Sequence, residues 1–99
     1  MLVMASWPKV REYAWRQLLI ARAIENQCYV CGVNRSGIGP GNLEFPKEGA
    51  MVLDYKGLPC HTRLSDTSIS ATLDYDKYER FLEKFAVWKD SDRFDLKLE

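Results

Sequence analysis

The sequence has little of what marks a membrane-spanning, nucleic-acid-binding or secreted protein. No apolar run approaches the roughly 20 residues that cross a bilayer, so we expect no membrane partner. The 14 Lys and Arg residues are balanced by 14 Asp and Glu residues, which argues against nucleic acid as a partner because phosphate binding needs an excess of basic side chains. Three cysteines are an odd number, and the opening MLVMASWP lacks a basic signal-peptide start. We therefore expect free thiols and a cytoplasmic location.

Side chains that carry chemistry are also few, and the chain has a single histidine. Cys28 and Cys31 are spaced C-x-x-C, as in zinc and redox sites, but positions i and i+3 of a strand face opposite sides of the sheet. Cys60 and His61 are adjacent, so they would also point apart on a strand, which disfavours a nucleophile–base pair. We interpret the first two cysteines as strand residues and predict no metal and no cofactor.

The hydrophobic pattern predicts one mixed α/β domain over residues 1–99, because the length allows no second core. Short apolar or alternating runs predict strands, spacings of three and four predict helices, and a stretch rich in Gly and Pro predicts a long loop. The expected elements are strands at 1–5, 28–33, 50–54, 58–64 and 68–73, helices at 10–27 and 75–84, a loop at 35–49 and an extended, docked arm at 86–99.

The first helix is expected to pack through one face of apolar and small side chains, namely Val10, Tyr13, Ala14, Leu18, Ala21 and Ile24. Several strands have the composition of strands that are buried on both faces, yet only two helices are available to cover them. We therefore predict a mixed sheet that is incomplete as it stands, with strand edges and apolar surface left uncovered.

Polar residues at the ends of elements are the candidate functional residues. Asn34 and Arg35 lie where a buried strand meets the Gly-rich loop, a common place for ligand contacts, and a ligand role and a loop-holding role both remain open. Trp7 follows the first strand, where it either lines a pocket or packs against the helix. Arg22 and Glu25 are spaced i, i+3 and are expected to form a structural ion pair, with Glu25 buried near the apolar face.

Several of these segments resemble the C-terminal half of the nitrilase, or carbon–nitrogen hydrolase, superfamily. They are ASWP, the helix ending ARAIENQ, CYVCGVNRSG, ISATLDYDKYERF and EKFAVWKDSDRFDL, and the last is similar to the omega-amidase-like branch. The resemblance implies the C-terminal portion of a four-layer α-β-β-α sandwich, in a family that is usually dimeric through helices and a C-terminal arm. It also implies amide hydrolysis by a Glu base, a Lys and a Cys nucleophile, without metal or cofactor.

In that family the three catalytic residues precede the segments that match this chain, and none of the cysteines here aligns with the nucleophile. The resemblance thus implies that residues 1–99 carry no catalytic residue and are inactive alone, with Trp7, Asn34 and Arg35 at the rim of the substrate pocket. The expected substrate is a small 2-oxo dicarboxylate monoamide, and the expected partner is a second copy or the missing N-terminal half. The alternative is a non-catalytic interaction or dimerisation module.

The sequence departs from the family pattern at four positions. Ser6 stands where Asn is common, Ala50 where Ser is usual, and Tyr55 and Ala86 where Pro is usual. Ala50 falls at the end of the loop at 38–50 and Tyr55 follows the next expected strand, so the resemblance leaves open which substrates that loop selects.

Overall fold

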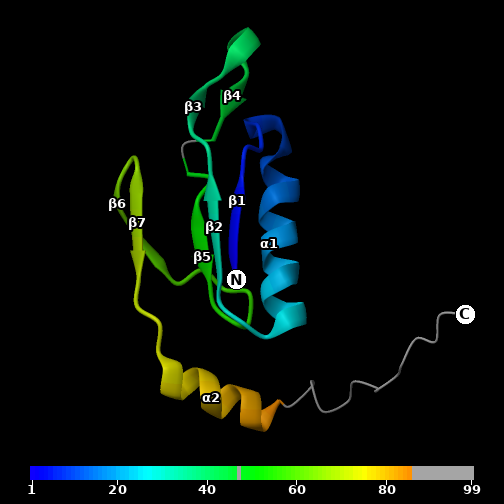
Figure 1. The fold of residues 1–99 in the computed structure, drawn as a ribbon, viewed down its shortest axis with the longest axis vertical. Helices are drawn as coiled ribbons and strands as arrows, with labels where there is room; N and C mark the ends of the chain where they lie inside the picture. The colour runs from blue at the N-terminus through cyan, green and yellow to red at the C-terminus, as the bar shows by residue number, and fades with distance from the viewer. Residues whose placement is uncertain (47, 86–99) are drawn as a thin grey trace, which may run out of the picture.

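A computed structural model describes residues 1–46 and 48–85. Figure 1 shows a mixed α/β arrangement in which a long helix lies beside a small central sheet. The strands are β1 (Leu2–Ala5), β2 (Val30–Asn34), β3 (Gly37–Ile38), β4 (Glu44–Phe45), β5 (Met51–Leu53), β6 (His61–Ser65) and β7 (Ser68–Ala71), and the helices are α1 (Glu12–Asn26) and α2 (Tyr75–Lys84), with 3₁₀ turns at Lys9–Arg11 and Pro40–Asn42. The arm predicted at 86–99 lies outside the described residues.

The central sheet has the strand order β1-β2-β5. β1 runs parallel to β2, with Leu2 opposite Cys31, and β5 runs antiparallel to β2, with Leu53 opposite Val30. The mixed sheet that the sequence predicts is therefore confirmed. Among the described residues the outer edge of β1 has no partner strand, and no described helix is long and apolar enough to cross a bilayer.

The core lies between α1 and one face of this sheet. Trp15, Leu19 and Ala23 project from α1 at positions i, i+4 and i+8 and pack on Val30 and Leu53. Gly32 allows the close approach, because a Cβ there would lie 2.5 Å from Leu19 Cδ1.

The helix face predicted from the sequence was wrong. Val10 and Tyr13 are 80% and 78% exposed, and Leu18 and Ile24 are also exposed. The helix has apolar side chains on two opposite sides. The prediction chose the side that does not carry Trp15. The side that carries Trp15 packs against the sheet, because its large ring buries the most apolar area and Gly32 leaves room for Leu19. The other side of α1 is left uncovered.

The end of α1 explains why β2 starts at Val30 and not at Cys28. Gln27 adopts a left-handed conformation (φ 46°, ψ 52°), and the Cys28 N–H donates to the Ala23 carbonyl at 3.2 Å. This bond and the left-handed residue are those of a helix-terminating turn. Cys28 therefore belongs to the end of the helix and packs, half-buried, against the core.

The loop predicted at 35–49 contains a short two-stranded ribbon, β3–β4, which projects beyond the end of the sheet in Figure 1. Gly41 and Asn42 have positive φ angles of 68° and 59°, and these two residues reverse the chain at the tip of the ribbon. The Gly39 N–H closes the turn by donating to the Leu43 carbonyl at 2.7 Å. The glycines thus form a tight ribbon in place of the structureless loop that we expected.

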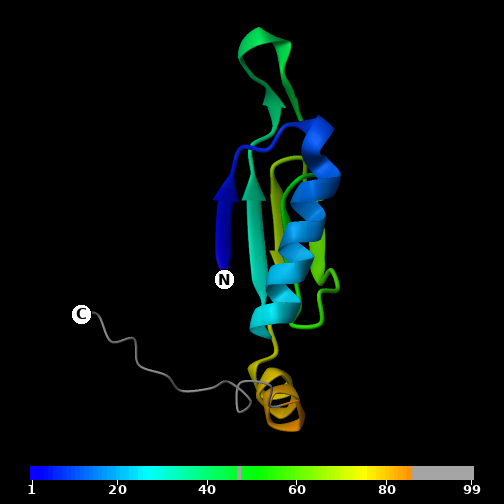
Figure 2. The same ribbon diagram turned by 90° about the vertical axis from the view of Figure 1, so that its right-hand side faces the viewer.

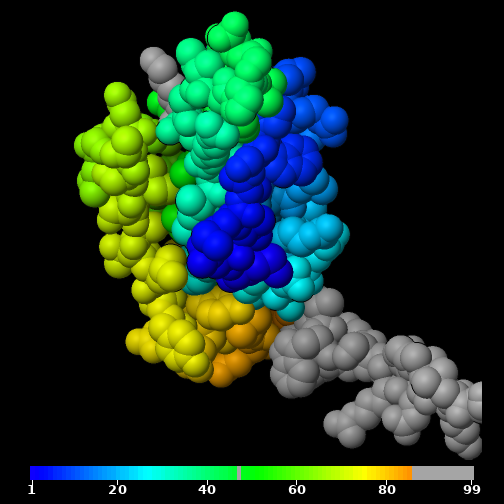
Figure 3. All heavy atoms as spheres, turned by 45° about the horizontal axis from the view of Figure 1, so that its top comes forward, coloured from blue at the N-terminus to red at the C-terminus, as the bar shows by residue number. Residues whose placement is uncertain are grey.

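The hairpin β6–β7 lies against the face of the sheet opposite α1, so the molecule has a helix, a sheet and a hairpin in three layers (Figures 1 and 2). The hairpin stands beside β2 and leaves β1 bare, as the β1 side chains at the front of Figure 3 show. Leu2 and Met4, which alternate with the core-facing Val3, are exposed, Met4 by 77%. An apolar face of the sheet is therefore uncovered, in agreement with the predicted shortfall.

Helix α2 closes the lower end of the molecule. The Asp74 carboxylate caps its start by accepting from the Lys77 N–H at 3.0 Å. Tyr78 donates its hydroxyl to the Gln27 carbonyl at 2.5 Å, and the Gln27 side-chain amide donates to the Phe85 carbonyl at 2.8 Å. Gln27 therefore links the C-terminal end of α1 to the middle of α2, at Tyr78, and to the residue that follows α2, Phe85.

Candidate functional site

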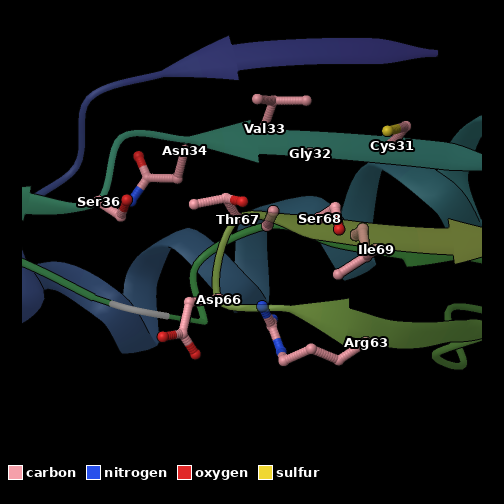
Figure 4. Close-up of a pocket in the computed structure, with 11 residues that line it drawn as sticks. Cys31, Gly32, Val33, Asn34, Ser36, Arg63, Asp66, Thr67, Ser68 and Ile69 are labelled. Carbon is pink, nitrogen blue, oxygen red and sulfur yellow. The ribbon is translucent and has the colours of Figure 1, made fainter.

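A cavity of about 400 Å³ lies between β2 and the β6–β7 hairpin (Figure 3). Its lining includes the apolar side chains of Cys31, Val33 and Ile69 and the polar side chains of Asn34, Ser36, Arg63, Asp66, Thr67 and Ser68 (Figure 4). Asn34, the last residue of β2, places one end of the cavity at the carboxyl termini of the parallel strands β1 and β2, where open α/β sheets bind their ligands. We call this space the hairpin cavity.

Asn34 is the predicted site residue that lies at the hairpin cavity. Its Oδ1 accepts from the Trp7 N–H at 2.8 Å, and its Nδ2 donates to the Trp7 carbonyl at 3.0 Å. The backbone of Gly49 lies so close that a Cβ there would be 2.8 Å from Nδ2. The amide therefore holds the chain that leaves β1 and leaves a single Nδ2 N–H for any other partner.

Trp7 and Arg35 do not line the hairpin cavity. The Trp7 ring packs at 6.2 Å from Trp15, whose Nε1 donates to the Gly49 carbonyl at 2.6 Å in a buried position. The Arg35 guanidinium lies 4.7 Å from the centre of the Phe45 ring, on the β3–β4 ribbon. In this structure the two side chains stabilise the surroundings of the strand ends by stacking.

Arg22 and Glu25 form an ion pair in which Nη1 and Oε2 are 2.7 Å apart. Both side chains are exposed, so the expected burial of Glu25 was wrong. Glu25 falls on a solvent-facing side of α1 because the buried face is centred on Trp15 and Leu19. An exposed pair of this kind contributes about 0–1 kcal/mol.

The cysteines and the histidine do not converge on one site. Cys31 faces the hairpin cavity, whereas Cys28 packs against the core. The Val52 N–H donates to His61 Nδ1 at 3.2 Å, which ties the imidazole to the edge of β5. Burial, followed by the nearby Asp54 carboxylate, raises the pKa of the Cys60 thiol, which makes it a weaker nucleophile at neutral pH. Within residues 1–46 and 48–85 no group of three or more His, Cys, Asp or Glu side chains could hold a metal ion.

Arg63, Thr67 and Ser68 were missed by the reasoning from sequence. They belong to the β6–β7 hairpin, which pairs Arg63 with Ile69. A charged residue in a short polar strand is typical of a solvent-facing position, so the one charged residue of the strand HTRLS does not by itself indicate a cavity.

The chain is similar to enzymes that hydrolyse carbon–nitrogen bonds. It is 39% identical over 97 residues to the omega-amidase YafV of Escherichia coli (strain K12), covering 96% of this chain and 38% of that protein. It is 31% identical over 90 residues to the 2-oxoglutaramate amidase of Bacillus subtilis (strain 168), covering 91% and 34%. The crystal structure of XC1258 from Xanthomonas campestris, a CN-hydrolase superfamily protein, superposes with a TM-score of 0.77 at 34% identity, covering 97% of this chain and 37% of that one.

Over nearly all of its residues the chain is similar, in sequence and in structure, to members of the carbon–nitrogen hydrolase superfamily. It matches no protein-family model. The chain spans a little over a third of the length of the carbon–nitrogen hydrolases that it matches.

Proposed function

We propose that the chain is the C-terminal part of a carbon–nitrogen hydrolase that removes the side-chain amide of a small 2-oxo dicarboxylate monoamide. The observation that carries the proposal is the match of nearly the whole chain to about a third of two such amidases. The hairpin cavity supports it, since the cavity reaches the carboxyl end of the parallel strands and is lined by both polar and apolar side chains.

The chemistry that we propose needs groups from another part of the enzyme. A Cys thiolate attacks the amide carbon, the tetrahedral intermediate expels ammonia with a proton from the Glu, and water then hydrolyses the thioester to the acid. A Lys ammonium stabilises the oxyanion. Because the resemblance places this Glu, Lys and Cys upstream, we infer that residues 1–99 are inactive alone. In the complete enzyme Asn34 would fix one wall of the pocket, with Trp7 and Arg35 behind its rim.

The uncovered surfaces of the chain support the same proposal. The free edge of β1 and the bare side chains of Leu2 and Met4 need a further strand and a further layer, as in the four-layer sandwich of the family. The uncovered side of α1 fits a helix-packed dimer. We therefore propose a cytoplasmic enzyme in which the chain associates with an N-terminal half and with a second copy.

A non-catalytic role as an interaction or dimerisation module is the second candidate. It is favoured by the same apolar side of α1, where Tyr13 and Ile24 are available to a partner without any catalytic half. The two candidates differ in what the chain does when the missing half is supplied, since a module alone would not complete an active amidase.

A hybrid enzyme tests the proposed function. The 97-residue matching segment of the Escherichia coli omega-amidase is replaced by this chain, and release of ammonia from 2-oxoglutaramate is measured. We expect activity from the hybrid, none from the chain alone, and none from a control hybrid whose upstream nucleophilic Cys is changed to Ala. A folded hybrid without activity would contradict the proposal and favour the module.

A further inference from the structure

The guanidinium of Arg63 lines the hairpin cavity and has no hydrogen-bond partner among the described residues. Its side chain is 26% exposed, so most of it is removed from water. Its one ion pair within the described part of the chain is with Glu48, where Nε and Oε1 are 3.7 Å apart, too far for a hydrogen bond. A guanidinium has five N–H donors, and none of them donates to a residue in 1–46 or 48–85. No buried side-chain nitrogen or oxygen of a described residue lacks a hydrogen-bond partner, so these free donors reach the solvent of the cavity and are open to an anion there.

The rest of the cavity does not supply that anion. Asp66 makes no ion pair with a described residue, and in Figure 4 its carboxylate points away from β2. Arg63 is the one cationic side chain among the described residues that line the cavity. Ser36 contributes only a neutral hydroxyl to the lining, and the Asn34 amide is engaged by Trp7.

We propose that Arg63 binds the carboxylate of the substrate in the hairpin cavity and so makes the enzyme select amides that carry an acid group. The proposal rests on the proposed function for the reaction, and it adds the residue that determines specificity. A guanidinium matches a carboxylate through two parallel N–H···O bonds. The Glu48 side chain is 69% exposed, so an incoming carboxylate can displace it into water.

The size and polarity of the cavity agree with a small acid. A volume of about 400 Å³ is at the lower end of ligand pockets, and it suits a molecule of a few carbons better than a large amide. The apolar walls from Val33 and Ile69 fit the methylene chain of such a substrate, which would leave its amide end to the catalytic groups of the other half.

Steady-state kinetics of the hybrid test this role with two amides of equal length, succinamate and the neutral butyramide. In R63M we expect the KM for succinamate to rise roughly 10- to 100-fold with kcat nearly unchanged, as for loss of a charge-assisted pair, and butyramide hydrolysis to stay the same. R63K keeps the charge but loses the planar fork, and we expect a rise of about 3- to 10-fold. Removing the competing carboxylate with E48Q should lower the KM.

Arg16→Met is the matched control, because Arg16 pairs with Glu12 on α1 and does not line the cavity. An equal loss on both amides in R63M, or no change in the KM for succinamate, would overturn the proposal while the proposed function stands. If the unmodified hybrid releases no ammonia from 2-oxoglutaramate, succinamate or butyramide, the proposed function fails, and a glutarate titration followed by calorimetry still decides the role of Arg63. Binding of glutarate that R63M abolishes supports that role, and no binding, or equal binding, overturns it.

Discussion

The side chain of Asn34 forms two hydrogen bonds with the backbone of Trp7, one from the Trp7 N–H and one to its carbonyl. The amide thereby repeats the pattern of a β-ladder one step beyond the end of the parallel pair β1–β2, where the chain itself has already turned away. The strand ends that form one wall of the hairpin cavity are held by this pair of bonds.

Two substitutions of Asn34 should lower the free energy of unfolding, and only one of them should do so in a pH-dependent way. N34A loses both bonds, and we expect the free energy of unfolding to fall by about 1–3 kcal/mol at every pH. N34D can accept from the Trp7 N–H, but its ionised carboxylate repels the Trp7 carbonyl, whereas its protonated form can accept and donate. The folded state therefore raises the pKa of the introduced carboxyl, so stability is retained at low pH and lost as the pH rises.

Chemical unfolding of both variants between pH 3.5 and 8 measures this difference. Asn42→Asp is the control, because Asn42 lies at the tip of the ribbon and should show no such dependence. Parallel pH curves for N34D and N34A would refute the bridge.

Two adjacent leucines of α1 test which side of the helix holds the core. Leu19 is 2% exposed and Leu18 is 44% exposed. We expect L19A to lower the free energy of unfolding by about 2–5 kcal/mol through cavity formation, and L18A by less than about 1 kcal/mol. Thermal and urea unfolding of the dilute chain give both values. A larger loss of stability for L18A than for L19A would support the helix face that was predicted from the sequence.

Alkaline pH should loosen the end of the molecule where α2 is docked. Burial, followed by the nearby Cys28, Tyr75 and Tyr29, raises the pKa of Tyr78 above its ordinary value of 10.0. A raised pKa means that the stabilisation is complete below about pH 10 and declines as the pH rises above it, because the phenolate cannot donate to Gln27.

Melting temperatures between pH 8 and 11.5 follow this loss. Y78F removes the hydroxyl and should flatten the alkaline decline, whereas Y13F, at an exposed position on α1, should leave it unchanged. Identical slopes for Y78F and the unmodified chain would contradict the assignment.

Cys28 and Cys31 should be dispensable for metal content. One sulfur packs at the end of a helix and the other faces the hairpin cavity, so the pair cannot hold one ion without rearrangement. We expect the double change to Ala to cost about 1–2 kcal/mol of packing and to leave the metal content unchanged. Elemental analysis of the purified chain checks the metal, and stoichiometric zinc that disappears on this change would show that the thiols bind it.

The order of elements could be predicted because the spacing of hydrophobic residues and the glycines that mark turns are local properties of the sequence. The packing face of α1 could not, because both sides of the helix are apolar and the choice depends on the room that Gly32 leaves under Leu19. Asn34 was found because a strand end next to a loop is a common ligand position. Its two bonds to Trp7 cross 27 residues of chain, and the role of Arg63 depends on which face of the hairpin meets β2, so neither is visible in the sequence.

Gln27 combines requirements that constrain its substitution. Its left-handed backbone ends α1, its carbonyl receives Tyr78, and its side chain reaches Phe85. Gly or Asn would suit the backbone better, but Gly has no amide and the Asn side chain is one methylene too short. A substitution of Gln27 therefore disturbs the end of α1 and the packing of α2 together. Such a substitution is expected in evolution only with a compensating substitution at a second position.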